Sequence, residues 1–211
     1  MFSTQKTKKN STGFTLVETI VVIFIFTLLA VGVTTLFTHI FVSSRDRLSS
    51  LDNVDQARLL ATNFTNEIRV ATTGQTGAFA LGQADNTQII FYSNYGQSAG
   101  VIARLRYYLT GSLLYKGVTL PTGNPLTYNL AQEQVQVKQA DVINNGQPLF
   151  YYYDGNYMGS STPLVQPVNV NQVKYVQLNL NILKKTTTAA TSTFNVRAGS
   201  SIRNLKDNLG N

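Results

Sequence analysis

The segment Gly13-Phe14-Thr15-Leu16-Val17-Glu18 opens a long uncharged apolar run, and this stretch decides the fold of the 211-residue chain. From Thr19 to Ser44 there is no Asp, Glu, Lys or Arg, and Val, Ile, Leu and Phe dominate these 26 residues. A helix of that length measures about 39 Å, which exceeds the roughly 30 Å of a bilayer core. The run therefore predicts a membrane-spanning helix.

Two other interpretations of the run compete with this prediction. A secretory signal peptide usually has a shorter apolar region of about 7–15 residues and a small-residue cleavage site. Here the run is longer, and its last residues, Ser43 and Ser44, are followed by Arg45 and Asp46 instead of a small-residue cleavage site. A plain single-span anchor remains open on hydropathy alone.

Glu18 is the residue that hydropathy does not explain. A charged group at the head of an apolar span costs about 2–4 kcal/mol and needs a partner. Lysines precede it at positions 6, 8 and 9, and basic residues favour a cytoplasmic N-terminus with the C-terminus outside.

The basic leader, Gly13, an aromatic residue, Thr-Leu, an apolar residue and Glu18 together resemble the prepilin signal of type IV pilins and type II secretion pseudopilins. The resemblance implies a prepilin peptidase and methyltransferase that cleaves between Gly13 and Phe14 and methylates the Phe14 amine. It also implies that Glu18 acts in filament assembly. Glu18 lies four residues after the new N-terminus. It would compensate the charge of the buried Phe14 amine in its own chain or in a neighbouring subunit.

Helical periodicity continues beyond the apolar run. Apolar residues recur every three or four positions, which predicts one buried face of an amphipathic helix: Leu51, Val54, Ala57, Ala61, Phe64, Ile68 and Ala71. The charged residues, Glu67 among them, are assigned to the remaining faces. No proline interrupts residues 14–71, and Thr72-Thr73-Gly74 predicts the end of the helix. A coiled-coil stalk is the alternative.

The C-terminal region reads as β-strands joined by turns. The predicted strands are Gln88–Tyr92, Val101–Leu109, Leu113–Lys116, Gln134–Lys138, Leu149–Tyr153, Val173–Ile182 and Thr193–Arg197. Gly111-Ser112 and Asp154-Gly155 are the clearest turn signals.

These observations predict an α+β fold, in which a long N-terminal helix packs on an antiparallel β-rich head. The expected organisation is a leader over residues 1–13, a membrane or filament-core helix over 14–44, its amphipathic continuation over 45–71, and a head over 72–211. The order of the pieces in the head resembles the larger minor pseudopilins, the J-type of type II secretion and the PilW-like minor pilins. Phe150 to Gly155, Val173 to Ile182 and Ser201 to Leu205 carry this resemblance.

Residues suited to catalysis or metal binding are sparse. His39 is the only histidine and lies in the apolar run, and the chain has no cysteine. The acids expected in the head are scattered: Asp85, Glu133, Asp141 and Asp154. We therefore expect no catalytic residues, no metal site and no cofactor, although a carboxylate pair brought together by folding stays open.

Two groups of residues raise the question of a ligand for the head. Phe150–Tyr153 with Asn156 and Tyr157 could stack on sugars or bases, but alternation along a strand favours core positions for about half of them. Arg104 and Arg106 share a strand face and could contact phosphates, but a solvated face is the favoured interpretation. The net charge is +7, and removal of the leader with Lys6, Lys8 and Lys9 lowers it to +4. Attraction of the mature chain to nucleic acid is therefore weak.

The sequence therefore predicts a non-enzymatic minor pilin or pseudopilin at the tip of a pilus-like or type II secretion-like filament. The expected partners are the peptidase, other pilins, the inner-membrane assembly platform and, before assembly, membrane lipid. The protein would pass from the cytoplasmic membrane into an extracellular or periplasmic filament. A head that binds extracellular DNA or a surface glycan is the alternative, and the single histidine and scattered acids disfavour a membrane-anchored enzyme.

Overall fold

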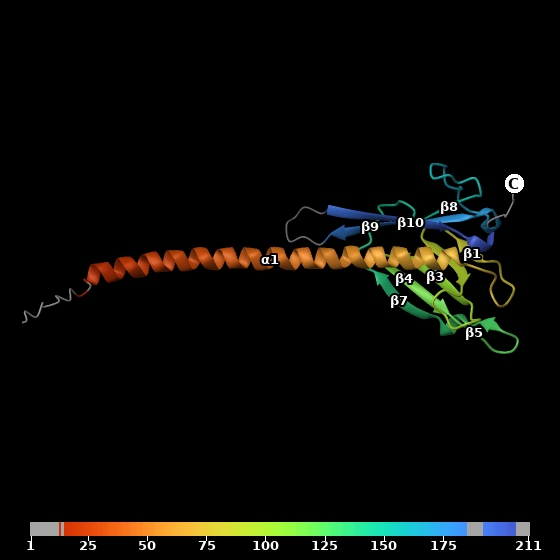
Figure 1. Cartoon of the computed structure of the whole chain (residues 1–211), viewed down its shortest axis with the longest axis horizontal. Helices are drawn as coiled ribbons and strands as arrows, with labels where there is room; N and C mark the ends of the chain where they lie inside the picture. Colours follow the sequence, from red (N-terminus) through yellow and green to blue (C-terminus); the bar gives the residue numbers. More distant parts are fainter. Residues whose placement is uncertain (1–12, 14, 185–191, 206–211) are drawn as a thin grey trace, which may run out of the picture. The chain divides into compact units, whose positions relative to one another are not determined.

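Helix α1 (Leu16–Arg69) is the longest element of the chain (Figure 1). The computed structural model describes Gly13, residues 15–184 and residues 192–205, and for residues 45–51 it describes the backbone alone. The chain divides into two compact units, Met1–Arg45 and Asp46–Asn211. The predicted α+β class, with a long N-terminal helix followed by an antiparallel β head, is confirmed.

The part of α1 that belongs to the second unit buries one face in the core of the head. The buried side chains recur once per helical turn, singly or as adjacent pairs, which puts them on one side of the helix. They are Val54, Ala57, Leu60, Ala61, Phe64, Glu67 and Ile68. The predicted apolar face is thus confirmed from Val54 onward, Leu60 widens it, and the side chain of Leu51 lies outside the described residues.

The helix ends where its backbone joins the head. Ala71 forms an isolated bridge with Ser93, and the Thr72 N–H donates to the Tyr92 carbonyl at 2.9 Å. The Asn204 side chain donates to the Ala71 carbonyl at 3.0 Å, so a residue near the C-terminus satisfies a carbonyl just past the helix end. At Gly74 a Cβ atom would lie 2.9 Å from the Tyr92 ring, which leaves no room for a side chain. The helix thus ends at Arg69, a few residues before the predicted stop at residues 72–74, because Ala71 already pairs with Ser93.

Five antiparallel strands form the larger sheet, in the order β1-β2-β3-β4-β7. Their bounds are β1 Leu81–Ala84, β2 Gln88–Ser93, β3 Ala103–Thr110, β4 Leu113–Thr119 and β7 Gln134–Gln139. Gly111, with φ at 59°, forms the predicted tight turn between β3 and β4. A small hairpin of β5 (Pro121–Thr122) and β6 (Thr127–Tyr128) and the short helix η1 (Leu130–Gln132) separate β4 from β7.

Three further strands form a second antiparallel sheet in the order β10-β9-β8. Their bounds are β8 Phe150–Tyr153, β9 Tyr175–Lys184 and β10 Ser192–Ser201. Short helices precede β9 and follow β10, η2 at Val170–Gln172 and η3 at Arg203–Leu205. β9 and β10 pair along ten residues, from Ser192–Lys184 to Ser201–Tyr175.

The head half of α1 lies between the two sheets, with β9 and β10 on one side and β3, β4 and β7 on the other (Figure 1). Phe64 is fully buried, and its ring contacts both sheets. The ring centroid lies 5.4 Å from Tyr107 of β3, 6.1 Å from Phe91 of β2 and 5.6 Å from Phe150 of β8. A single aromatic residue of the helix thus joins the two sheets into one core.

The predicted strands are found, but the structure differs from the prediction in the extent of some strands, in the burial of β7 and in the presence of strands that were not predicted. The last strand is β10, which runs well beyond the predicted Thr193–Arg197 because long pairing with β9 carries it on. β7 alternates in sequence, but most of its residues are exposed because it is an edge strand. β1 was not predicted, since its short sequence Leu-Gly-Gln-Ala has no strand signal.

Candidate functional site

The first turn of α1 carries a helix cap built from Thr15 and Glu18. The Thr15 hydroxyl accepts the Glu18 backbone N–H at 3.3 Å, and the Thr15 carbonyl accepts the Thr19 N–H at 3.1 Å. Thr15 is therefore the N-cap residue, and Glu18 occupies the third helical position, the spacing of a capping box. A carboxylate there also lies favourably in the field of the helix dipole.

Gly13 lies two residues before the cap residue Thr15, outside the helix and exposed. Within 4 Å of the position that a Cβ atom would occupy there is no other heavy atom. Phe14, the predicted new N-terminus and methylation site, lies outside the described residues. The predicted junction thus stands beside the helix N-terminus, and the predicted roles of Gly13, Phe14 and Glu18 stay predictions.

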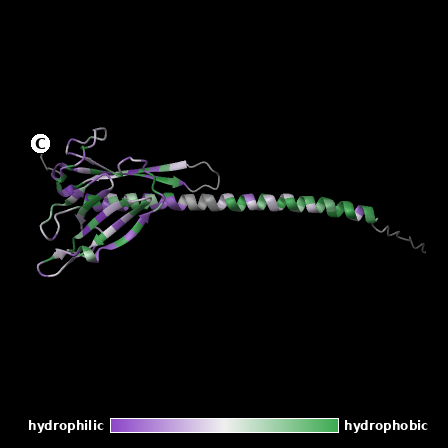
Figure 2. Ribbon diagram, turned by 180° about the vertical axis from the view of Figure 1, so that it is seen from behind, coloured by the Kyte–Doolittle hydropathy of each residue, from purple (hydrophilic) through white to green (hydrophobic). Residues whose placement is uncertain are grey.

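The apolar half of α1 covers Leu16–Ser44 and has a mean hydropathy of 2.7. Figure 2 shows the hydrophobic colour along this half of the helix, whereas the strands of the head mix both colours. Its side chains are exposed all around the helix, Leu16 at 77% and Phe26 at 71%. By length and composition these 29 residues are sufficient to cross a membrane.

The hydroxyl groups of threonines within the apolar half donate hydrogen bonds to backbone carbonyls of the same helix. Thr27 donates to the Ile23 and Phe24 carbonyls, Thr34 to Ala30 at 2.7 Å, and Thr38 to Thr35 at 2.8 Å. A polar residue that bonds back to its own helix is tolerated in hydrocarbon. His39 lies on the same half, and across the described residues no group of three or more His, Cys, Asp or Glu could hold a metal ion.

Glu67 corrects the prediction that all charged residues of the second helical part face solvent. It is 4% exposed, accepts a hydrogen bond from the Tyr107 hydroxyl at 2.7 Å, and forms an ion pair with Lys116 of β4. Burial raises the pKa of Tyr107 well above its ordinary value, and the Glu67 carboxylate adds to that rise. The trio fixes the helix on the inner face of the larger sheet. The positions of Glu67, Tyr107 and Lys116 in the sequence gave no signal that these residues would meet.

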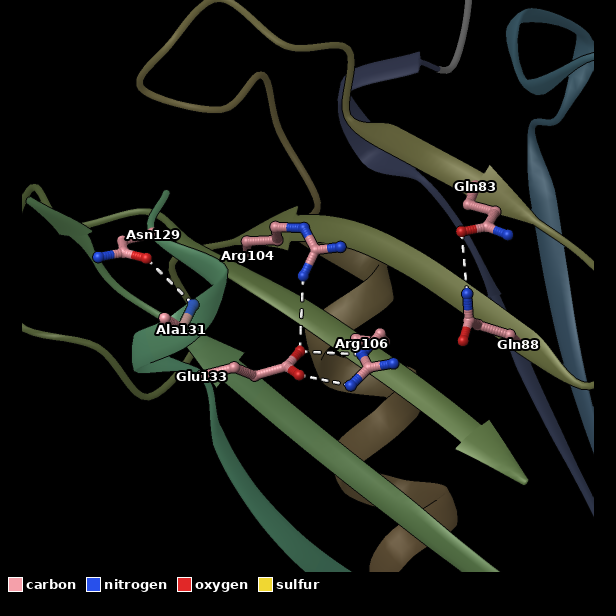
Figure 3. Close-up of polar contacts among 7 residues, drawn as sticks. All are labelled: Gln83, Gln88, Arg104, Arg106, Asn129, Ala131 and Glu133. Atoms are coloured by element: carbon pink, nitrogen blue, oxygen red, sulfur yellow. Dashed lines mark hydrogen bonds and ion pairs between the residues drawn. The ribbon is translucent and has the colours of Figure 1, made fainter. Parts of the chain in front are cut away.

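Arg104 and Arg106 do not form the solvated face that was favoured from the sequence. Both point toward Glu133, as Figure 3 shows. The Arg106 Nε lies 2.9 Å from the Glu133 Oε1, its Nη2 binds the other carboxylate oxygen, and the Arg104 Nη1 lies 3.5 Å from Oε1. The hydrogen bond to Glu133 raises the pKa of Arg106. Because the carboxylate occupies both guanidinium groups, this contact replaces the phosphate contact that the sequence raised.

The remaining acids and the aromatic cluster also have structural roles. Asp85 accepts from the Gln83 side chain, and Asp154 accepts from Asn156 within the predicted turn. Phe150 and Tyr152 are buried, as alternation predicted, but Tyr153 is buried as well, so the core takes more than half of this strand. The Tyr157 ring lies 4.0 Å from that of Tyr153 and 4.5 Å from that of Tyr175, so these rings pack on one another.

Comparison with known proteins adds one specific finding. Residues 8–34 match the model of the prokaryotic N-terminal methylation motif, a stretch that contains Gly13, Phe14, Glu18 and the first half of the apolar run. A search of curated proteins found no match to this chain. The motif is that of structural pilin subunits, which implies processing by a prepilin peptidase and assembly with other pilins. The N-terminal segment therefore supports a type IV pilin-like subunit with a membrane-anchoring helix.

Proposed function

We propose that the chain is a non-enzymatic minor pilin or pseudopilin that enters a pilus-like or type II secretion-like filament, most like the J-type and PilW-like subunits. The observation that carries this proposal is the capped helix N-terminus, Thr15 with Glu18, at the head of an exposed apolar helix within the methylation motif. Such a helix needs an apolar environment, first the bilayer and then the packed core of a filament.

Under this proposal the chain has four parts: a leader over residues 1–13, a core helix over 14–44, an amphipathic part over 45–71 and a head over 72–211. The leader stays in the cytoplasm, and the head lies outside the cytoplasmic membrane. The inner-membrane assembly platform then inserts the processed subunit beside other pilins. The head is bulky, which suits a place at the filament tip.

Processing is the first expected result. The native host should contain a product of residues 14–211 that carries one added methyl group, because the peptidase cuts after Gly13 and methylates the Phe14 amine. Intact-mass analysis of the membrane and filament fractions measures this directly. A Gly13→Val variant is the control, since a branched side chain at the junction should leave the leader attached. A mature N-terminus at another residue would refute the prepilin assignment.

A minor role is tested by abundance. We expect this chain to be at least tenfold scarcer than the major subunit of the filament, since a tip has room for few copies while the shaft has many. Quantitative mass spectrometry of sheared filaments gives the ratio, with the major subunit of the same sample as the reference. Equal or greater abundance of this chain would make it a shaft subunit.

A further inference from the structure

A groove runs between the head half of α1 and the edge of the smaller sheet. It has a volume of about 520 Å³ and is lined from the helix by Arg58, Ala61, Thr62, Thr65, Asn66 and Arg69. From the sheet it is lined by Val196, Arg197 and Ala198 of β10. Three of these described lining residues are arginines and none is acidic, so the groove favours an anionic occupant.

The β10 side of the groove is the edge of a strand. Neighbouring side chains on a strand point to opposite faces, so three consecutive lining residues place the backbone of β10 along the groove. Among the described strands β10 pairs with β9 only, along all ten of its residues, and its other edge has no partner strand. The free backbone groups of such an edge can pair with an added strand.

The helix side carries a polar stripe in register with that edge. Arg58, Thr62, Thr65 and Arg69 are spaced by four, three and four residues, so they share one helix face. Within the described residues, Arg58 forms an exposed ion pair with Asp55 at 3.6 Å, which is a weak constraint, and lies 5.6 Å from the centroid of the Phe194 ring. The Arg69 Nε donates to the Ser200 hydroxyl at 3.4 Å. Both guanidinium groups therefore keep donors for a carboxylate.

We propose that this groove binds an extended acidic segment of another protein chain, which adds as a fourth strand beside β10 and places carboxylates against Arg58 and Arg69. The two arginines are 11 residues apart, about 16 Å along the helix, which matches about five residues of a strand. The segment thus has acids four or six positions apart, so that both lie on one face. The inference that a neighbouring subunit of the filament supplies this segment rests on the proposed function. The groove itself does not depend on that function.

Peptide binding tests the groove with the full chain in neutral detergent micelles. The probe is a labelled eleven-residue peptide of alternating Thr and Glu with blocked ends, and the matched peptide replaces each Glu by Gln. We expect the acidic peptide to bind at least tenfold more tightly, to weaken with added salt, and to protect β10 amides from hydrogen exchange. Arg58→Gln and Arg69→Gln should each weaken it about tenfold. Lys138→Gln, on the far edge strand β7, should leave affinity within about twofold.

Four results would overturn the proposal: no binding of the acidic peptide, equal binding of the two peptides, no protection in β10, or arginine variants that behave like Lys138→Gln. Duplex DNA that binds more tightly than the acidic peptide, with the same dependence on Arg58 and Arg69, would identify a phosphate site and also reject it. The intact-mass experiment separates this proposal from the proposed function. If the chain binds the acidic peptide but is not cleaved after Gly13, the groove proposal stands and the proposed filament function is rejected.

Discussion

Glu18→Val should leave cleavage after Gly13 largely intact and lower incorporation of the subunit into the filament at least tenfold. After cleavage the Phe14 amine is a cation at the head of an apolar helix, with an ordinary pKa of about 7.7–8. In a filament core an unpaired charge costs several kcal/mol, so removal of Glu18 leaves that amine without compensation. Co-purification of the processed variant with other subunits, relative to the wild-type chain, is the measurement.

The structure supplies a control that separates two roles of Glu18. The hydrogen bond of the observed cap uses the Glu18 backbone N–H, which both substitutions keep. Glu18→Gln also keeps a side chain that suits the third position of a capping box, and it removes only the charge. If the charge recruits the subunit, Glu18→Gln should fail like Glu18→Val. Incorporation of the Gln variant at the wild-type level would show that helix capping, not charge compensation, is the contribution of this residue.

Glu67→Leu should lower the free energy of unfolding of the head by about 3 kcal/mol. The substitution leaves the Lys116 ammonium, 15% exposed, without its carboxylate, and it removes the acceptor of the Tyr107 hydroxyl. Denaturant unfolding of the full chain in detergent, followed by near-UV circular dichroism of the tyrosines, measures the loss.

Two further variants test the origin of that loss. Adding Lys116→Met to Glu67→Leu should recover much of the stability, since an apolar pair needs no compensation. Asp55→Ala, which breaks the exposed pair with Arg58, should change the free energy by less than about 0.5 kcal/mol. A single Glu67→Leu variant as stable as Asp55→Ala would show that the buried trio contributes nothing to the docking of the helix.

The contrast between the two arginine groups has a structural cause. Arg104 and Arg106 lie on one strand face and looked equally free in the sequence, but folding brings Glu133, the last residue before β7, across β4 to meet both of them. Gly117 of β4 makes this possible, because a Cβ atom there would lie 2.4 Å from the Glu133 carboxylate. Arg58 and Arg69, by contrast, looked like ordinary charged positions of an amphipathic helix, and the structure places them over a groove.

The apolar helix, the apolar positions of its buried face from Val54 to Ile68 and most of the strands were predictable from the sequence. These features are local: hydropathy, a period of three to four residues, alternation and turn residues act over a few neighbours and leave a direct trace in the chain. The tertiary structure alone decided the order of the strands, the burial of Glu67, the capture of Arg104 and Arg106 by Glu133, and the groove beside β10. The last three depend on residues 27 to 140 positions apart that meet only when two sheets close on one helix, and no periodicity encodes such a meeting.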